Sequence, residues 1–253
     1  MTDIKQAVHD QFSKTAANYR TSAVHAAGED LTAIARLVAQ DDAPVVLDAG
    51  CGAGHTAINV APHSAEVIAL DLSAQMLAQV ERLAHERGLT NLGTRQGDVE
   101  NLPFENATFD IVTSRYSAHH WPNPAQALRE IARVLKSGGR FILSDIVAAE
   151  QPTYDTFLQA LELLRDPSHV RDHRISEWQA MYEAAGFQVD VVMTWALPLN
   201  FDDWVVRMAT PDLNIAMLKR LYEAASDDVR RAFAIQSDYG FSIPGALFEG
   251  RRS

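Results

Sequence analysis

The sequence predicts an α/β fold, in which a seven-stranded and mostly parallel sheet carries helices on both faces. Three observations predict it. Short apolar segments alternate with amphipathic helical segments along most of the chain, as in repeated βαβ units. The first apolar segment runs into a glycine-rich loop, which is how a nucleotide-binding unit opens. Before the last strand, residues 196–244 are long enough for two or three helices, so we expect a helical insertion there.

The chain begins with helical patterns rather than with a strand. A loose apolar stripe at helical spacing comprises Ile4, Val8, Phe12 and Tyr19. Residues 23–38 form a second amphipathic segment. Residues 1–40 are therefore expected to form a helical segment ahead of the sheet.

The glycine-rich loop lies in residues 44–55, which read P-V-V-L-D-A-G-C-G-A-G-H. The run V-V-L-D suits a strand that is buried on both faces. Glycines then occupy every second position: Gly50, Gly52 and Gly54. They let the backbone turn tightly and approach a ligand closely. A dinucleotide fingerprint would need its third glycine at His55. A ligand with a ribose but no pyrophosphate therefore fits this loop better.

A second apolar strand, E-V-I-A-L-D, ends on Asp71, 21 residues after Gly50. An acidic side chain at that place can accept hydrogen bonds from both hydroxyls of a ribose. Ser73 is a good N-cap for the helix that follows, and Gly88 is a natural stop for it.

Three further strands are expected in the first part of the chain, at residues 94–99, 109–114 and 140–147. Residues 115–124, R-Y-S-A-H-H-W-P-N-P, follow the fourth strand and precede a helix at 124–135. This loop faces the ligand crevice, because that crevice lies beyond the carboxyl ends of the strands. His119 and His120 can each act as a general base, since imidazole titrates near neutrality. Alternatively, both histidines and Trp121 brace the start of the helix.

The last part of the chain is expected to hold a helix that begins at Ser176 and strands at residues 189–195 and 245–251. Before that helix, Arg171 is the best candidate for an anion-recognising edge of the substrate pocket. A solvated loop is the alternative. No metal-ligand set stands out in the sequence.

Four segments in order carry a resemblance to a known family: V-L-D-A-G-C-G-A-G-H, A-L-D-L-S-A-Q-M-L, G-D-V-E-N-L-P-F and F-D-I-V-T-S-R. Together they resemble the class I S-adenosylmethionine-dependent methyltransferases. Within these, the chain is similar to the small-molecule, type 11 branch that includes the ubiquinone and menaquinone C-methyltransferases. The resemblance covers about residues 45–147. It implies a Rossmann-like sheet, S-adenosylmethionine as cofactor and S-adenosylhomocysteine as product.

The resemblance also implies which residues bind the cofactor. The expected set is Tyr19, Asp48, Gly50, Cys51, Gly52, Asp71, Leu72, Met76, Asp98, Val99 and Arg115. In it, Asp98 accepts from the adenine amine, although a lone Gly-Asp pair is more typical of a turn cap. Arg115 lies beside the methionine end through its backbone carbonyl. Asp48 adds negative charge near the amino-acid end, and Met76 either packs on adenine or belongs to the core.

We expect the chain to have four parts: a helical lid at residues 1–40, a cofactor-binding core at 41–195, a helical cap at 196–244 and the final strand at 245–253. In the lid, Tyr19 and Arg20 are the expected contacts, and a surface helix on the sheet edge is the alternative. We expect the cap to cover the substrate side, with Trp204 as a tentative substrate contact. A dimer interface is the competing explanation.

Composition narrows the class of protein. A formal charge of −11 argues against a nucleic-acid groove, which needs clustered basic residues. The single cysteine, Cys51, fits a reducing compartment. No apolar run approaches the roughly 20 residues of a membrane span, and the N-terminus lacks signal-peptide features. We therefore expect a cytoplasmic protein, monomeric or homodimeric, whose partner is a small-molecule acceptor.

The expected chemistry is in-line displacement of the cofactor's electrophilic methyl group by the acceptor. Such a reaction needs positioning and water exclusion rather than a protein nucleophile. Two alternatives stay open from the sequence. One is an NAD-dependent oxidoreductase, which shares the strand, the loop and the ribose carboxylate. The other is a non-catalytic cofactor-binding or regulatory protein with the same fold.

Overall fold

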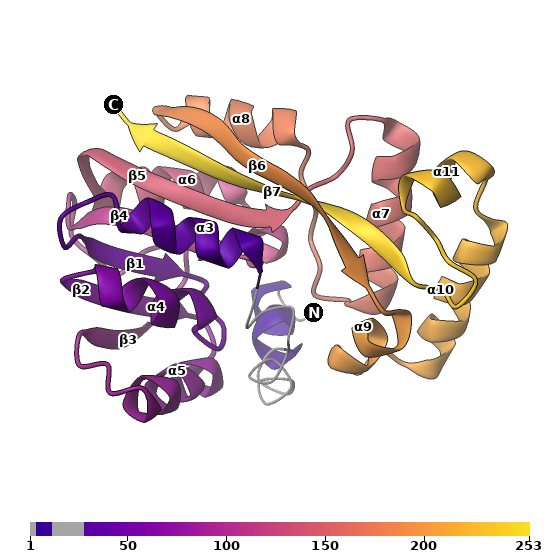
Figure 1. The fold of residues 1–253 in the computed structure, drawn as a ribbon, viewed down its shortest axis with the longest axis horizontal. Coiled ribbons are helices and arrows are strands. Elements are labelled where there is room, and N and C mark those ends of the chain that lie inside the picture. Colours follow the sequence, from indigo (N-terminus) through magenta and orange to yellow (C-terminus); the bar gives the residue numbers. More distant parts are fainter. Residues whose placement is uncertain (1–3, 12–27) are drawn as a thin grey trace.

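The computed structural model describes residues 4–11 and 28–253, and it confirms a seven-stranded, mostly parallel sheet. The strands lie in the order β3-β2-β1-β4-β5-β7-β6 (Figure 1). Their bounds are β1 Val45–Ala49, β2 Glu66–Asp71, β3 Leu92–Gln96, β4 Phe109–Arg115, β5 Leu135–Ile146, β6 Phe187–Leu199 and β7 Phe241–Arg252. The first five strands pair in parallel, and β7 runs antiparallel to both β5 and β6.

Helices cover both faces of this sheet. They are α3 Glu29–Val38, α4 His55–Val60, α5 Ala74–Glu86, α6 Pro124–Val134 and α8 Ile175–Ala184. Neighbouring residues of β1 point to opposite faces, so Val46 packs in a core with α3, α4 and α5, while Leu47 packs in a core with α6 and α8. The α/β core is thus a three-layer structure with one hydrophobic core on each side of the sheet.

The sequence predicts capping residues for two helices, α5 and α8, and the structure confirms those of α5 only. The Ser73 side chain accepts from the Met76 N–H and caps α5, which stops before Gly88 at φ +65°, as predicted. The prediction that α8 begins at Ser176 is wrong. The helix begins one residue earlier, and the Arg174 N–H donates to the carboxylate of Glu177. The Ser176 hydroxyl is not available as a cap, because it hydrogen-bonds to Glu150.

Several strands have other bounds than the sequence predicts. β3 lies at Leu92–Gln96 rather than 94–99, because Asp98 forms a tight bridge with Asn101. β5 starts at Leu135, which pairs with Phe109 ahead of a register shift. β6 and β7 extend well beyond 189–195 and 245–251, because they pair with each other along nearly their whole length. As a two-stranded ribbon they run past the core (Figure 1).

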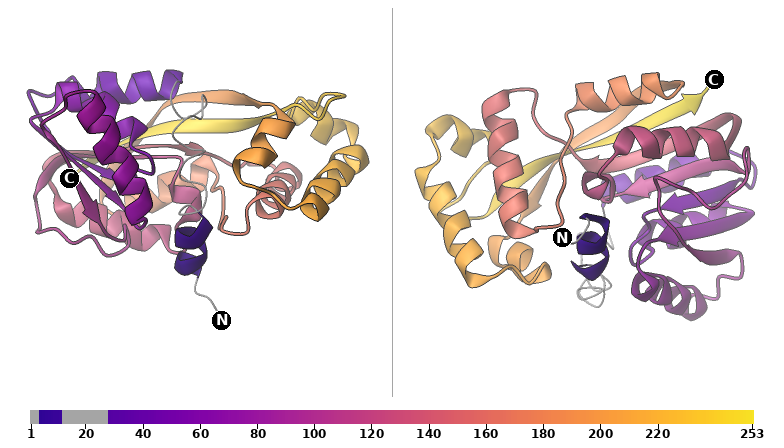
Figure 2. Two further views of the ribbon diagram at one scale, coloured as in Figure 1. Left: turned by 90° about the horizontal axis from the view of Figure 1, so that it is seen from below. Right: turned by 180° about the vertical axis from the view of Figure 1, so that it is seen from behind.

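Four helices gather at the far end of that ribbon: α7 Pro152–Arg165, α9 Phe201–Arg207, α10 Asp212–Ala224 and α11 Asp227–Ala232 (Figures 1 and 2). We call them the helical cap. Three of them lie between β6 and β7, and α7 comes from the chain before β6. Leu158 and Leu161 of α7 share a hydrophobic cluster with Phe201, Trp204 and Tyr222. The cap therefore has a core of its own, built from two separate stretches of chain.

The helix at residues 4–11 lies between the core and the cap in both orientations that show it clearly (Figures 1 and 2). Its Lys5 is 93 residues in sequence from Asp98, to which it binds. Within the described residues, no helix has the length and apolarity to cross a bilayer.

Candidate functional site: two cavities at the ends of the strands

The glycine-rich loop is fixed to the sheet by its backbone. The N–H groups of Gly50 and Cys51 donate to the Leu70 carbonyl at 2.8 and 2.9 Å, and the Gly52 N–H donates to Asp71 Oδ2 at 2.9 Å. Gly50 has φ +71°, and a Cβ on it would lie 2.0 Å from Ser117 Oγ. Only glycine fits there, both for its backbone and for its close contact with the next strand's loop.

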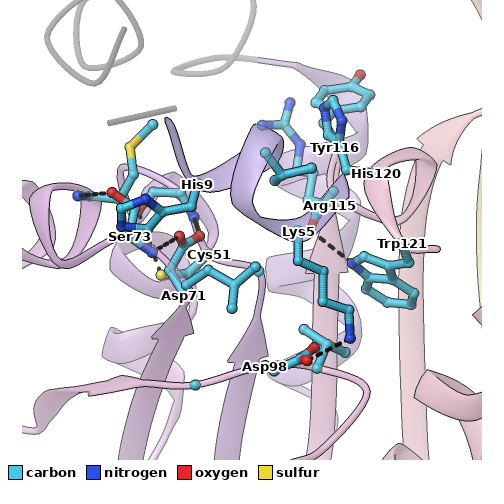
Figure 3. A pocket seen from close by; sticks show the side chains of 18 of the residues that line it. Lys5, His9, Cys51, Asp71, Ser73, Asp98, Arg115, Tyr116, His120 and Trp121 are labelled. Atoms are coloured by element: carbon cyan, nitrogen blue, oxygen red, sulfur yellow. Dashed lines mark hydrogen bonds and ion pairs between the residues drawn. The ribbon is translucent and has the colours of Figure 1, made fainter. Parts of the chain in front are cut away.

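Around this loop lies the first cavity, at the carboxyl ends of β1, β2 and β4 and the turn after β3 (Figure 3). The structure brings most of the predicted cofactor residues to its wall: Gly50, Cys51, Gly52, Asp71, Leu72, Met76, Asp98, Val99 and Arg115. Tyr19 and Arg20 lie outside the described residues. Segments that the sequence separates by up to 65 positions thus line a single hollow.

Two carboxylates stand on the wall of this cavity. Asp71 is half-buried; its Oδ1 accepts from the Ser73 N–H at 2.9 Å, and burial raises its pKa. Asp98 Oδ1 accepts from the Glu100 N–H at 2.9 Å, which is the turn-capping role that the sequence left open. Its Oδ2 faces the cavity side and binds Lys5. Both oxygens of Asp71 accept backbone N–H groups, and Asp98 accepts one backbone N–H and the Lys5 ammonium, so both carboxylates are fixed in place.

Asp48 belongs to the expected cofactor-binding set but does not line the cavity. Its carboxylate is buried, accepts from the Ala57 N–H at 3.0 Å and accepts from the Thr113 hydroxyl at 3.0 Å. Burial raises its pKa to about 7, even though these two hydrogen bonds favour the charged form. Asp48 therefore joins the first turn of α4 to β4. It can influence a ligand in the first cavity only indirectly, by positioning α4.

Lys5 belongs to the first cavity and was missed by the sequence reading. Its ammonium lies 2.6 Å from Asp98 Oδ2 and 2.6 Å from Glu100 Oε2, so the helix at residues 4–11 is attached to the turn after β3 (Figure 3). Val8 and His9 of the same helix also line the cavity. The spacing of Lys5 and His9, one helical turn apart, is the signal that was available.

Arg115 contributes its side chain to a buried ion pair. Its guanidinium binds Asp30 of α3, with Nε to Oδ2 at 2.5 Å and Nη2 to Oδ1 at 3.1 Å, and Ser144 donates to the same carboxylate. It also lies 4.5 Å from the centroid of the Tyr116 ring. The side chain therefore joins α3 to the end of β4, where the cavity begins.

A second cavity lies between the first one and the helical cap. Its lining includes apolar side chains, among them Leu197, Leu199 and Trp204. It also includes polar and charged ones, namely Tyr116, His119, His120, Glu162, Arg165, Asp166, Asp172 and Arg207. Among the described residues, Tyr116 and His120 line both cavities. Tyr116 has φ +50°, a conformation that is rare for a bulky residue and that marks local strain where the cavities meet.

Arg171, the predicted anion-binding residue, does not line either cavity. Its guanidinium lies 2.8 Å from Asp155 and 3.7 Å from Glu177, on the outer side of the loop. The two carboxylates already neutralise it. Trp204, by contrast, lines the second cavity as expected for a substrate contact.

His119 and His120 have different charge states although they are adjacent. Burial opposes protonation of His119, but Asp145, whose Oδ1 is 2.6 Å from Nδ1, outweighs it and raises the His119 pKa to about 9. Burial and the neighbouring His119 lower the pKa of His120 to about 4. At neutral pH the first is an imidazolium and the second is a neutral imidazole.

The tautomer of His120 follows from its hydrogen bond. Its Nδ1 lies 3.0 Å from the Ser168 carbonyl, which can only accept, so Nδ1 carries the proton. In the neutral ring, Nε2 then holds a lone pair. His120 is therefore the histidine of the pair with an unprotonated ring nitrogen at neutral pH, its lowered pKa of about 4 makes it a weak base, and it lines both cavities.

Comparison with known proteins decides the family. A profile of the methyltransferase domain matches residues 47–143. The chain is 42% identical over 224 residues to the uncharacterised methyltransferase YcgJ of Bacillus subtilis, covering 88% of each chain. The crystal structure of YcgJ superposes with a TM-score of 0.85 at 37% identity, covering 88% of this chain and 97% of that one. This chain belongs to the S-adenosylmethionine-dependent methyltransferases.

Two other relatives extend the comparison. The uncharacterised protein YafE of Escherichia coli is 44% identical over 193 residues, which is 76% of this chain and 93% of YafE. The demethylmenaquinone methyltransferase of Lactococcus lactis is 36% identical over 121 residues, or 47% of each chain. The expected resemblance to the quinone methyltransferases is thus confirmed, and the oxidoreductase alternative is not supported.

The first cavity of this methyltransferase fits the chemistry of its family's cofactor. Leu72, Met76 and Val99 provide an apolar surface, and Asp71 and Asp98 provide hydrogen-bond acceptors beside it. The glycine at position 50 keeps the loop free of a side chain where the backbone borders the hollow. An apolar slot with two carboxylates at its edge suits an adenosine group, which has a flat ring, an amine and two hydroxyls.

Proposed function

We propose that this methyltransferase binds S-adenosylmethionine in the first cavity and transfers the methyl group to a small-molecule acceptor in the second. The observation that carries the proposal is that Tyr116 and His120 line both cavities. A methyl group can pass directly only where the two ligands meet. The residues at that junction are therefore the ones expected to flank the reacting atoms.

In this proposal each part of the first cavity has a role. Asp71 accepts from the ribose hydroxyls, and Asp98 accepts from the adenine amine. Leu72, Met76 and Val99 enclose the ring. The loop Gly50–Gly52 and the backbone at Arg115 border the methionine end. Tyr19, outside the described residues, stays a predicted lid contact.

The bound cofactor supplies an electrophilic methyl group, so the protein needs no nucleophile of its own. The chain's contribution is to hold the acceptor atom about 3–3.5 Å from the methyl carbon and to keep water out. His120 can remove a proton from the acceptor, because it is neutral and its Nε2 is unprotonated. His119 is proposed to act as a cation and a hydrogen-bond donor rather than as a base.

The setting of the reaction is part of the same proposal. A strongly acidic chain with a single cysteine is expected to act in the cytoplasm on a free small molecule rather than on a nucleic acid. The cap, with its own hydrophobic cluster, is proposed to enclose the acceptor.

Calorimetric titration tests the cofactor assignment. We expect S-adenosylhomocysteine to bind the wild-type chain and NAD not to bind. Asp71→Ala removes the ribose acceptor and should weaken binding by about 1–3 kcal/mol, or roughly 5- to 150-fold. Asp110→Ala is the control, because Asp110 binds the Val45 N–H and Lys136 and does not line either cavity. Equal affinity of wild type and Asp71→Ala would remove the ribose assignment.

A further inference from the structure

Among the described residues, a buried carboxyl oxygen without a hydrogen bond lies in the wall of the second cavity. The Asp172 side chain is 1% exposed, and within the described residues its Oδ2 makes no hydrogen bond. The nearest basic nitrogen, His169 Nε2, is 3.8 Å away and already lies 3.1 Å from Gln159 Oε1. Buried polar groups are almost always paired, so an orphan oxygen on a cavity wall indicates a ligand.

The loop that carries Asp172 is held in place from α7. Gln159 accepts from the Asp172 N–H at 3.1 Å and donates to the Asp172 carbonyl at 2.8 Å. Earlier in the same loop, Asp166 Oδ1 accepts from both the N–H and the hydroxyl of Ser168. Backbone and side-chain bonds therefore fix the orphan carboxyl toward the cavity without using it.

The surroundings of Asp172 decide whether it accepts or donates. Burial, together with the nearby carboxylate of Glu162, raises its pKa well above the usual range. His169 cannot serve as its cation, because burial and the neighbouring histidines lower the His169 pKa to about 2. The raised pKa favours the protonated form of Asp172, and a protonated carboxyl donates a hydrogen bond.

His119 supplies a second donor on the same wall. Its Nδ1–H is taken by Asp145, so the imidazolium has Nε2–H left for a ligand. His119 and Asp172 thus add two donors to a lining that also holds the guanidinium groups of Arg165 and Arg207, and the neutral His120 lines both this cavity and the first one. Donors placed on a developing oxyanion, with a base nearby, are the arrangement that stabilises a deprotonated carbonyl compound or phenol.

We propose that Asp172 and His119 together bind an oxygen of the methyl acceptor, which is an enol-forming carbonyl compound or a phenol rather than an amine or a thiol. This inference rests on the proposed function of the second cavity. The acceptor's proton passes to His120 Nε2, and negative charge builds on the oxygen that Asp172 and His119 hold. The electron pair left on the acceptor takes the methyl group, and sulfur keeps the pair of the broken carbon–sulfur bond.

The test uses the intact chain, saturated with S-adenosylhomocysteine, and 4-nitrophenol as the probe. The absorption of this phenol reports its binding and its ionisation. We expect wild type to bind it, Asp172→Leu to lose at least tenfold in affinity and Asp172→Asn, which keeps a neutral donor, to stay within threefold. Asp190→Leu is the matched control, because Asp190 is an exposed carboxylate on β6 outside both cavities. All four proteins should bind S-adenosylhomocysteine equally.

Three results would overturn the inference. Wild-type affinity in Asp172→Leu would show that the carboxyl does not contact the probe. Equal loss in the Asn and Leu variants, with benzylamine binding to wild type, would assign Asp172 to a cation and favour an amine acceptor. Failure of wild type to bind 4-nitrophenol while S-adenosylhomocysteine binds normally would remove the acceptor class and leave the cofactor site intact. Absence of S-adenosylhomocysteine binding would instead contradict the proposed function itself.

Discussion

At the scale of single residues, Gly50 combines two requirements that no other residue meets. It has φ +71°, and a Cβ would approach Ser117 Oγ to 2.0 Å. Gly138 has a similar φ of +74° but open space around it. A comparison of alanine substitutions at Gly50 and Gly138 therefore distinguishes the cost of backbone strain from the cost of a clash with Ser117.

We predict that Gly50→Ala destabilises the fold by more than Gly138→Ala and also weakens S-adenosylhomocysteine binding. The strain of a positive φ alone costs on the order of 1 kcal/mol, and the clash with Ser117 adds to it. Urea unfolding and calorimetric titration of both variants provide the measurement. If the two variants lose equal stability and Gly50→Ala binds normally, the close contact at Ser117 has no role.

The charge of His119 depends on one carboxylate. Its pKa of about 9 lies above the ordinary value near 6.5, so protonation stabilises the folded state. The contribution is fully present below about pH 6.5 and is lost as the pH rises through about 9. Asp145 also accepts from the Ala118 N–H through Oδ2 and from the Ile146 N–H through Oδ1, so a substitution should keep an acceptor oxygen.

Asp145→Asn keeps an acceptor but removes the charge. We predict that it lowers the pKa of His119 toward or below its ordinary value and removes about 1–3 kcal/mol of unfolding free energy at pH 6, with less effect at pH 9.5. NMR titration of the imidazole and urea unfolding at both pH values measure this. A His119 pKa that stays near 9 in the variant would show that Asp145 is not its cause.

At the scale of secondary-structure elements, the helix at residues 4–11 is attached to the turn after β3 by Lys5. Two ion pairs of 2.6 Å hold it, and the Lys5 side chain is 30% exposed. Ion pairs at this exposure contribute little, about 0.2–1 kcal/mol. The helix is therefore expected to open easily and to close over the first cavity.

We predict that Lys5→Met increases amide hydrogen exchange in residues 4–11 about two- to fivefold and leaves the sheet unchanged. Lys136→Met serves as the control, since Lys136 also pairs with a carboxylate, Asp110, at 2.8 Å but lies outside both cavities. Mass-spectrometric hydrogen exchange measures both variants. Unchanged exchange in Lys5→Met would mean that the apolar contacts of Val8, rather than the ion pairs, hold the helix.

At the scale of the whole molecule, the core and the cap have separate hydrophobic clusters joined by the β6–β7 ribbon. Trp204 belongs to the cap cluster, is 1% exposed and lines the second cavity. It does not line the first. Cap stability and cofactor binding are thus expected to be separable.

Trp204→Ala tests that separation. Removal of a buried Trp costs about 3–5 kcal/mol, so we predict a lower unfolding free energy and loss of 4-nitrophenol binding, with S-adenosylhomocysteine affinity retained. Val206→Ala, on the same helix and 69% exposed, should change neither. Loss of S-adenosylhomocysteine binding in Trp204→Ala would show that cap and core depend on each other.

The sequence by itself determined the α/β core and most of the first cavity. Gly50 and Asp71 can be identified from the pattern of a few residues around them, because a tight turn or a strand end is specified by near neighbours. The order of the four motifs along the chain also predicted that Asp98 lines the first cavity. Strand lengths were less predictable, since β6 and β7 are extended by their mutual pairing.

Only the tertiary structure decided the second cavity and the charges in it. His119 meets Asp145 from 26 residues away, His120 meets Ser168 from 48, and Arg115 meets Asp30 from 85. A pKa or a tautomer depends on such distant partners and on burial, and neither can be obtained from local pattern. The same reason explains why local pattern does not show that Asp48 is internal, that Arg171 lies outside the cavities or that Asp172 lines one of them.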